Sequence, residues 1–386
     1  MSTIKVNKIE NTATADGGIA IDASGHVTAD GQQLPTAGAL SHRRINENGA
    51  MNVAQRSTSV TGVTASGYYT VDRYQLAISS LGTYTVTQES DGPDGFSNSF
   101  KIDCTTADSS PAAGDVLLFF QAIEAQNLQS LGYGTSGAQA ITISYYVKSN
   151  KTGNASFGVQ QKDNSDKQVS FQYTISSANT WEKKTHTIPG DTSGVINDDN
   201  GSGLTLEWFL NSGSNFTGGS HRATWTAEDN TDRNVSNLGI GGSTSDYWQI
   251  TGVQLEVGEA ATSFEHRSFG DELARCQRYY AQSYTYGTTA GTATSVGAIF
   301  STAYAAAAYA DAGTAHFPVP MRAIPSVTVY GTSAGTAGKV NADSTEGTGV
   351  AFNPGDKSVM LTRSNDSSGV GVNVFMRAHY TASAEL

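Results

Sequence analysis

The sequence has few charges, cysteines and prolines and no long apolar run, and each shortage excludes a class of protein. Of its 386 residues, 15% are charged, 8 are proline and 2 are cysteine. No segment approaches the roughly 20 apolar residues that cross a bilayer as a helix, and the first residues lack the apolar stretch of a secretory signal. We therefore expect that the chain folds in a cytosol and does not insert into a membrane. Cys104 and Cys276 lie in different predicted units, which predicts two buried free thiols.

Positive charge is also scarce. Lysine and arginine number 23 against 35 aspartate and glutamate residues, which gives a net charge of −12 and a pI near 5.0. No block of basic residues forms a stripe that could follow a phosphate backbone. Nucleic acid is therefore not expected as a partner.

Glycine is abundant, and in several segments apolar and polar side chains alternate. Glycine numbers 42, and serine, threonine and asparagine are plentiful, as is typical of turn-dense β proteins. Three segments alternate between apolar and polar side chains, which predicts strands with one buried face. We therefore expect residues 43–267 to form an antiparallel two-sheet β-sandwich of the jelly-roll type. The predicted inward faces are Ile141, Ile143, Tyr145 and Val147, then Val169, Phe171, Tyr173 and Ile175, then Leu204, Leu206, Trp208 and Leu210.

Residues 1–42 are predicted to form a short N-terminal β arm and a linker. The expected strands are very short and are separated by glycine-containing turns. Such a segment cannot close a core alone, so it would gain stability by pairing with copies of itself or with a partner. Its apolar residues are Ile4, Val6, Ile9, Ile19, Ile21 and Val27.

The remainder of the chain completes an all-β organisation around one helix. Residues 268–282 predict a short connecting helix, in which Ser268 caps the amide of Asp271. Residues 283–386 predict a smaller C-terminal β domain. The run AYAAAAYADAG at 303–313 suits a helix by propensity and a strand by its position, so it stays unassigned.

Several strings of the sequence together carry a resemblance to one family. They are RRINENGAMNVAQRSTSV, TVDRYQLAIS, SDGPDGFSNSFKID, WEKKTHTIPGDTSG and YWQITGVQLEVGEAATSFEHRS, then DELARCQRYY in the connecting helix, FPVPMRAIPSVTVY after it and GGIAIDASGHVT in the arm. With these strings, the chain resembles the carbohydrate-binding-module-like jelly roll of many bacteriophage tail fibre and virion fibre proteins. The resemblance implies a virion component, assembled in the bacterial host cytoplasm and usually a homotrimer. Its arm would bind other tail or capsid proteins, and the protein would attach to a host-surface glycan or receptor.

Glycan binding needs aromatic rings that stack on the C–H faces of sugars, with polar groups nearby. Strand phase directs Tyr146 and Phe209 outward if the residue before each points inward. Trp225 and Trp248 fall in polar stretches where a ring can face a ligand. These four rings are the predicted platform, and packing in the core or between subunits is the alternative for each.

Two acidic loops could hold a structural Ca²⁺, and no other cofactor is expected. The DGPDG loop supplies Asp91 and Asp94, and the NDDNG loop supplies Asp198 and Asn200. Carboxylate and carbonyl oxygens on a bend suit a hard cation. Ordinary Asx-turns are the alternative.

No motif indicates catalysis. Residues 331–335 (GTSAG) match the nucleophile elbow, but no helical pattern follows to complete it, which favours a hairpin loop. We therefore predict a non-enzymatic fibre subunit of a bacteriophage virion that attaches to a host-surface glycan. Two alternatives stay open: a purely structural spacer or a capsid or tail decoration protein, and a polysaccharide depolymerase, because paired carboxylates meet in space rather than in sequence.

Overall fold

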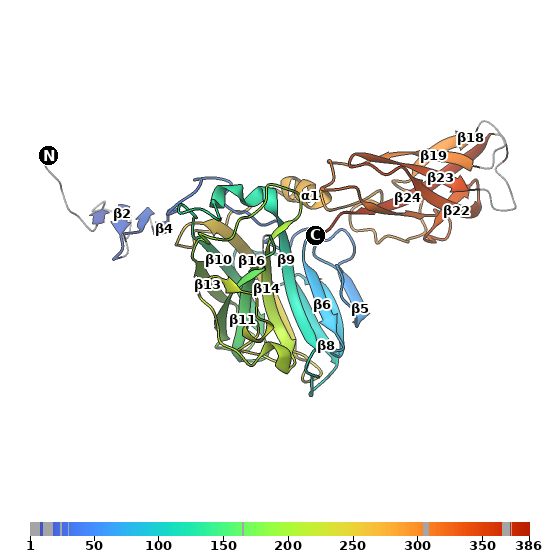
Figure 1. Cartoon of the computed structure of the whole chain (residues 1–386). Helices are drawn as coiled ribbons and strands as arrows, with labels where there is room; N and C mark the ends of the chain where they lie inside the picture. Colours follow the sequence, from blue (N-terminus) through green and yellow to red (C-terminus); the bar gives the residue numbers. More distant parts are fainter. Residues whose placement is uncertain are drawn as a thin grey trace, which may run out of the picture.

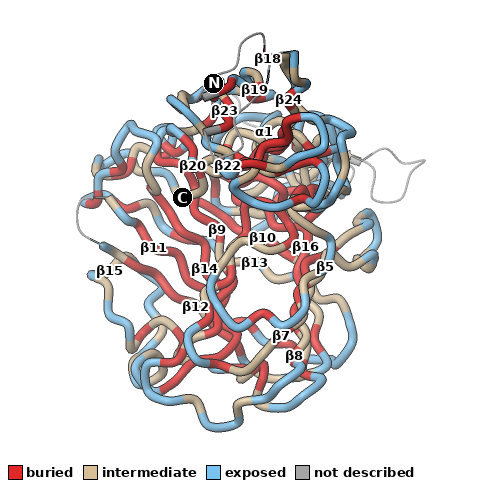
Figure 2. The backbone as a smooth tube through the Cα atoms, turned by 90° about the vertical axis from the view of Figure 1, so that its right-hand side faces the viewer, coloured by how far each residue is buried: buried red, intermediate tan, exposed pale blue. Residues whose placement is uncertain are grey.

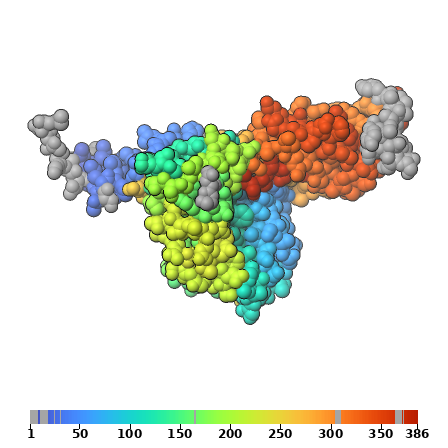
Figure 3. All heavy atoms as spheres, in the orientation of Figure 1, coloured from blue at the N-terminus to red at the C-terminus, as the bar shows by residue number. Residues whose placement is uncertain are grey.

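The computed structural model arranges the chain as three successive β parts (Figure 1). A small N-terminal sheet lies at one end, a two-sheet body in the middle and an elongated β unit at the other end; Figure 3 shows the same order on the surface. The prediction of an all-β jelly roll with a smaller C-terminal β unit is confirmed. The structure describes residues 8–10, 18–23, 25–29, 31–163, 166–303, 309–364, 371 and 373–386.

The body consists of two antiparallel sheets of six strands each. The first sheet has the order β13-β10-β16-β8-β7-β5, and the second has the order β15-β12-β11-β14-β9-β6. The strands are β5 (Ser59–Val63), β6 (Gln75–Ser79), β7 (Thr83–Glu89), β8 (Ser99–Thr106), β9 (Val116–Glu124), β10 (Ile141–Ser149), β11 (Gly153–Gln161), β12 (Lys167–Ile175), β13 (Glu182–Ile188), β14 (Ser202–Ser212), β15 (Thr226–Ala227) and β16 (Tyr247–Val257).

One apolar core fills the space between these sheets, and Figure 2 shows the facing strands as buried. Tyr145 and Trp208 are fully buried, and their rings meet edge to face with centroids 5.5 Å apart. The predicted inward faces are confirmed; Phe171 is only partly buried, but it packs against the core and lies beside His186. Because aromatic side chains from both sheets interlock here, the core fixes which face of each sheet remains outside.

The outer face of the second sheet is covered by the chain that follows β14. This segment, residues 213–240, contains η2 (Ser214–Phe216), β15 and η3 (Asn230–Asp232). Arg233 donates to both carboxylate oxygens of Glu207, at 2.9 and 3.0 Å. Its guanidinium carbon also lies 5.1 Å from the ring centre of Phe209. A ligand therefore cannot reach the sheet at these positions, since protein already covers it.

A short helix opens the junction between the body and the C-terminal unit. In α1 (Phe269–Gln277), the Ser268 hydroxyl accepts a hydrogen bond from the Asp271 amide, as predicted. The helix ends at Gln277 rather than continuing to 282, because Tyr280–Gln282 forms β17 and pairs with β24 (Val374–Ser383). In the described part of the chain, no helix has the length and apolar character needed to span a membrane.

A buried charge network joins the body to the C-terminal unit. Glu385 accepts hydrogen bonds from Arg56, at 3.0 Å, and from Arg73, both of which belong to the body. Arg73 is fully buried, and its guanidinium carbon lies 3.4 Å from the ring centre of Tyr279. Tyr279 in turn donates to Glu124 of β9 at 2.8 Å. Buried charges are costly unless they are paired, so this network fixes the two parts together.

The C-terminal unit is built around β24. This strand pairs with β17, β18, β20 and β21, and the sheet continues through β22 and β23 to β19. Its core is formed by small and aliphatic side chains, among them Ala312, Val340, Leu361 and Met376. The remaining strands are β18 (Ile299–Ala303), β19 (Tyr309–His316), β20 (Ser326–Tyr330), β21 (Lys339–Ala342), β22 (Thr345–Phe352) and β23 (Ser358–Ser364).

The structure answers three smaller questions that the sequence raises. The GTSAG segment is the loop between β20 and β21, and in this described stretch no helix follows it, as predicted. In the AYAAAAYADAG run, Ala303 is the last residue of β18 and residues 309–313 begin β19, while residues 304–308 lie outside the described residues. Cys104 and Cys276 are both buried and free, as predicted.

The N-terminal arm is a small sheet with the order β1-β2-β3-β4, formed by β1 (Lys8–Glu10), β2 (Gly18–Ile21), β3 (Val27–Ala29) and β4 (Gln32–Gln33). Ile9 pairs with Ile19 across β1 and β2, and Ile21 follows on the same face of β2. These three side chains are 61%, 47% and 43% exposed. Ile4 and Val6 lie outside the described residues.

Candidate ligand-binding site

A hollow of about 290 Å³ opens on the outer face of the first sheet. The sheet forms its floor, and two loops form its walls. One loop connects β7 to β8, and the other follows β16. The lining residues are Ser144 and Tyr146 of β10, Lys183 of β13, Gly252 of β16, Asp94 and Phe96 of the first loop, and Ser263, Phe264 and His266 of the second.

A bulge in β16 creates the floor of the hollow. Ser144 pairs with Gln254, but Tyr146 pairs with Thr251, so β16 carries an extra residue between these two pairs. Gly252 lies within the bulge at φ 64°, a conformation that glycine adopts without strain. A Cβ atom at Gly252 would lie 2.9 Å from the rings of both Phe96 and Tyr146. Only glycine therefore lets these two rings lie directly on the sheet.

Phe96 is the centre of a cluster of four rings. Its centroid lies 5.5 Å from that of Tyr146, 4.9 Å from that of Phe264 and 5.2 Å from that of His266. Phe264 and His266 also meet edge to face at 4.7 Å. Rings in contact with one another hold each other's orientation, so the cluster presents a pre-formed apolar surface rather than a set of mobile side chains.

Polar groups stand around this apolar surface. Lys183 lies beside Tyr146, with its Nζ 6.0 Å from the ring centre, and Asp94 and Ser263 are exposed at the rim. Partial burial, assisted by the nearby charge of Arg44, lowers the pKa of His266 below its usual value. His266 is therefore mostly neutral at pH 7, when its ring both donates and accepts hydrogen bonds.

This combination suits a hydroxyl-rich ligand with an apolar face. The rings can cover the C–H face of a sugar, while a carboxylate, an ammonium group, hydroxyls and an imidazole are placed to bond its hydroxyl groups. Of the described residues that line the hollow, Asp94 is the only carboxylate. The hollow is also smaller than a drug-sized pocket, so it fits one or two sugar rings.

Two of the four predicted platform rings, Tyr146 and Trp225, remain partly accessible, but only Tyr146 lies in the hollow. Tyr146 lies on its floor, as its strand phase indicates. Trp225 lies elsewhere, partly buried, where its ring meets Tyr133 edge to face and its Nε1 donates to the carbonyl of Pro189 at 2.7 Å. The role of each ring in binding stays a prediction.

The other two rings are not ligand-facing, and the prediction for them is wrong. Phe209 points outward from β14 as expected but is only 1% exposed, because Arg233 and Phe216 of the covering segment lie over it. Trp248 is fully buried in the core, with its ring 5.5 Å from that of Phe119. Its polar flanks suggested exposure, but alternation with the buried Ile250 places it inside.

One residue of each acidic loop, Asp91 or Asn200, bonds to another part of the chain. Asp91 accepts hydrogen bonds from Lys148 at 2.6 Å and from Trp181 at 3.4 Å. Burial opposes the charge of Asp91, but these donors outweigh it and hold the pKa of its carboxyl below the usual value. Asn200 donates to the carbonyl of Arg322 at the junction, 2.7 Å away. Among the described residues no three His, Cys, Asp or Glu side chains gather as a metal site, and Ca²⁺ at Asp91, Asp94, Asp198 or Asn200 stays a prediction.

Strand periodicity does not reveal three of the four rings in the cluster. Phe96, Phe264 and His266 lie in loops, where no alternation shows the direction of a side chain. One signal was present, since Phe96 falls in the string SDGPDGFSNSFKID, and Phe264 and His266 fall in the string that ends ATSFEHRS. Both strings carry the resemblance to fibre jelly rolls.

Comparisons with known proteins yield similar folds only. No family model matches the chain, and no curated protein matches it. Among solved structures, the enzymatically active domain of tailspike protein 4 of bacteriophage CBA120 is 14% identical, with a TM-score of 0.29, over 55% of this chain and 21% of that one. The chain thus spans about a fifth of the length of that tailspike structure.

Two further solved structures come from Clostridium thermocellum. A family 11 carbohydrate-binding module in complex with a β-1,3-1,4-mixed-linked tetrasaccharide is 10% identical, with a TM-score of 0.27, over 54% of this chain and 99% of that one. The CBM22-1–GH10 modules of xylanase 10B, complexed with xylohexaose, are 10% identical, with a TM-score of 0.28, over 55% of this chain and 30% of that one. At these TM-scores the likeness carries no argument about the function of this chain.

Proposed function

We propose that the chain is a non-catalytic glycan-binding protein, and that the hollow on the first sheet is its binding site. The observation that carries the proposal is the ring cluster around Phe96, held by the bulge at Gly252 and surrounded by polar groups. Large aromatic rings normally fill the core of a β-sandwich. Here Tyr146, Phe96 and Phe264 remain partly exposed on an outer face, where a sugar can stack on them.

The same hollow argues for binding rather than hydrolysis. Most glycosidases need two carboxyl groups on opposite sides of the scissile bond. Asp94 is the only carboxylate among the described residues that line the hollow, and it is exposed rather than buried beside a second acid. We therefore favour an attachment protein over a depolymerase.

The arrangement of the three parts supports a role as a fibre subunit of a bacteriophage virion. The arm and the C-terminal unit lie at opposite ends of the molecule (Figure 1), and the charge network at Glu385 stiffens the connection between body and C-terminal unit. A molecule whose parts lie end to end suits a protein that reaches from a particle to a host surface. The resemblance of the body and arm strings to virion fibre proteins agrees with this assignment.

The arm supplies an argument for self-association. Ile9, Ile19 and Ile21 form an exposed aliphatic face on a sheet that is too small to build a core of its own. Pairing three copies would bury these faces and place three hollows on one fibre. Avidity then compensates for weak single sites, since linked sites raise the effective concentration of each other.

Removing the arm tests self-association. We expect the full chain to be a trimer in solution and a variant lacking residues 1–33 to be a monomer, because the exposed isoleucine face is lost while the body is untouched. Light scattering coupled to size-exclusion chromatography measures both masses. A full-length chain that is monomeric at micromolar concentration would contradict the proposal.

A tyrosine substitution tests glycan binding. We expect the protein to bind a subset of bacterial surface oligosaccharides on a glycan array, and Tyr146→Ala to weaken that binding about 10-fold, as is typical when one stacking ring of about 1–1.5 kcal/mol is lost. Tyr146→Phe should retain most of the binding, since the ring remains.

The matched control is Phe300→Ala, which removes a 67% exposed ring on the C-terminal unit, outside the hollow. Binding unchanged in Tyr146→Ala but lost in Phe300→Ala would move the site to the C-terminal unit.

Competition with virions separates the attachment role from that of a spacer. Purified protein should block adsorption of virions to host cells if it attaches, and should leave adsorption unchanged if it is only structural.

A further inference from the structure

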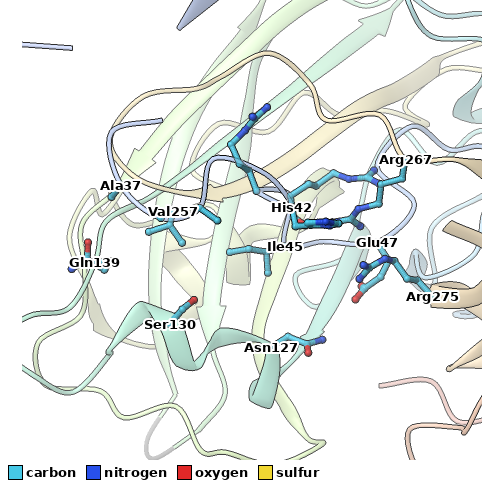
Figure 4. A pocket seen from close by; sticks show the side chains of 14 residues that line it. Ala37, His42, Ile45, Glu47, Asn127, Ser130, Gln139, Val257, Arg267 and Arg275 are labelled. Carbon is cyan, nitrogen blue, oxygen red and sulfur yellow. The ribbon is translucent and has the colours of Figure 1, made fainter. Parts of the chain in front are cut away.

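A second cavity, of about 510 Å³, lies where the linker after the arm meets the body (Figure 4). It is lined by residues 37–47, where the linker passes into the body, by η1 (Ala125–Leu131) with the nearby Gln139, by the end of β16 at Val257, and by the chain around α1. It shares no lining residue with the hollow on the first sheet. A ligand here would therefore occupy a separate site.

Arginines dominate one wall of this cavity although the chain as a whole is acidic. Four arginines line it, and three of them approach a carboxylate only at distances beyond hydrogen-bonding range. The pairs are Arg275 and Asp271 at 3.6 Å, Arg267 and Glu272 at 3.7 Å, and Arg43 and Glu256 at 3.9 Å.

The fourth arginine, Arg44, competes with Arg267 for the same carboxylate. Glu272 accepts a hydrogen bond from Arg44 and also faces Arg267, and both guanidinium side chains are almost completely buried. Glu47, which also lines the cavity, and Glu265 are further carboxylates that interact with Arg267. Burial and then the charge of Arg44 lower the pKa of Arg267, while the carboxylates of Glu272 and Glu265 act in the opposite direction.

Several guanidinium N–H groups at this wall have no acceptor. Nε and Nη1 of Arg44, Nε of Arg267 and Nε of Arg275 are buried and find no hydrogen-bond partner among the described residues. A buried donor without an acceptor is costly, so folded proteins seldom leave several together. An oxyanion in the cavity would supply acceptors for such donors.

The opposite wall has a different chemistry. In Figure 4, Asn127, Ser130 and Gln139 stand across the cavity from the group formed by Arg267, Arg275 and Glu47. Apolar carbon is contributed by Ala37, Ile45 and Val257. Amides and a hydroxyl suit hydroxyl groups, and the apolar patch suits C–H groups. A bare inorganic anion would leave this half of the cavity without a role.

We propose that this cavity binds a sugar acid, that is, a hydroxylated ring bearing one carboxylate. The carboxylate would lie against the arginines, and the ring would extend toward Asn127, Ser130 and Gln139. The volume is within the usual range for small-ligand pockets and holds one or two such rings. This site is separate from the hollow, so binding of a sugar acid here can be tested independently of the proposed function.

Calorimetric titration of the full-length protein tests the site. The probes are glucuronate and N-acetylneuraminate as sugar acids, glucose as the neutral control and inorganic phosphate as the simple anion. We expect at least one sugar acid to bind at least about tenfold more tightly than glucose or phosphate, since one charge-assisted hydrogen bond accounts for a difference of that size. Arg275→Ala, at a side chain that is 41% exposed, should fold normally and weaken this binding about tenfold.

Two control variants separate the sites. Arg377→Ala removes one positive charge on the C-terminal unit, and Tyr146→Ala alters the hollow; both should leave binding of the sugar acid unchanged. The proposal is overturned if neither sugar acid binds, if glucose or phosphate binds as tightly, or if Arg275→Ala binds like the unaltered chain. Loss of binding in Tyr146→Ala alone would place the ligand in the hollow and would overturn the second site as well.

Discussion

Glu385→Gln should lower the free energy of unfolding by about 3–5 kcal/mol, as expected when a buried ion pair loses one partner. Glu385 is the carboxylate that Arg56 and Arg73 share at the junction. Without it, the only carboxylate left to the fully buried Arg73 would be Glu47, whose Oε2 is 3.7 Å from its Nε. Burial raises the pKa of Glu47, so this carboxyl is a weak counter-ion. The buried positive charge would then be largely uncompensated.

Urea-induced unfolding followed by fluorescence measures this loss. The matched control is Glu89→Gln, because Glu89 is 41% exposed on its side chain and only 4.0 Å from Lys101. An exposed pair of this kind contributes little, so this change should cost less than about 0.5 kcal/mol. Equal and small effects of the two substitutions would show that the junction network does not hold the parts together.

Gly252→Ala should both destabilise the body and abolish glycan binding. The positive φ of this position costs an alanine about 1 kcal/mol. The new Cβ would also lie 2.9 Å from the rings of Phe96 and Tyr146, and overpacking of this kind costs about 1–3 kcal/mol more. Because both rings must move, the surface on which a sugar stacks is lost.

Gly62→Ala separates these two effects. Gly62 has a similar φ of 71°, but a Cβ atom there would meet nothing within 4 Å. It should therefore lose only the backbone contribution of about 1 kcal/mol and keep full binding. Thermal unfolding and binding are measured for both variants. Unaltered binding in Gly252→Ala would mean that the rings of the hollow are not the recognition surface.

The fold could be predicted because strand periodicity is a local property of the sequence. Alternation placed Tyr145 and Trp208 in the core and Tyr146 outside it without knowledge of the strand order. The prediction for Trp248 is wrong because its polar neighbours suggested exposure. Its spacing of two residues from the buried Ile250 indicates the inner face of the strand instead. The error at Phe209 has another cause, because the phase was right and a separate segment covers that face.

The site itself could be predicted only in part. The sequence indicates Tyr146 as a sugar platform and Asp94 as a calcium ligand, and the structure brings both to the same hollow. Their neighbours Phe264 and His266 come from a loop far away in the sequence, and no spacing rule connects the two loops. The extra residue of the bulge, at Gly252, depends on the pairing of β10 with β16, which a single sequence does not reveal.

The position of a bound oligosaccharide tests the central claim most directly. A crystal structure of the protein with an oligosaccharide selected from the glycan array should show a sugar ring stacked on Phe96 or Tyr146, with its hydroxyls near Lys183, Asp94 or His266. Density for the sugar on the C-terminal unit or on the covered face of the second sheet, with the hollow empty, would contradict the account.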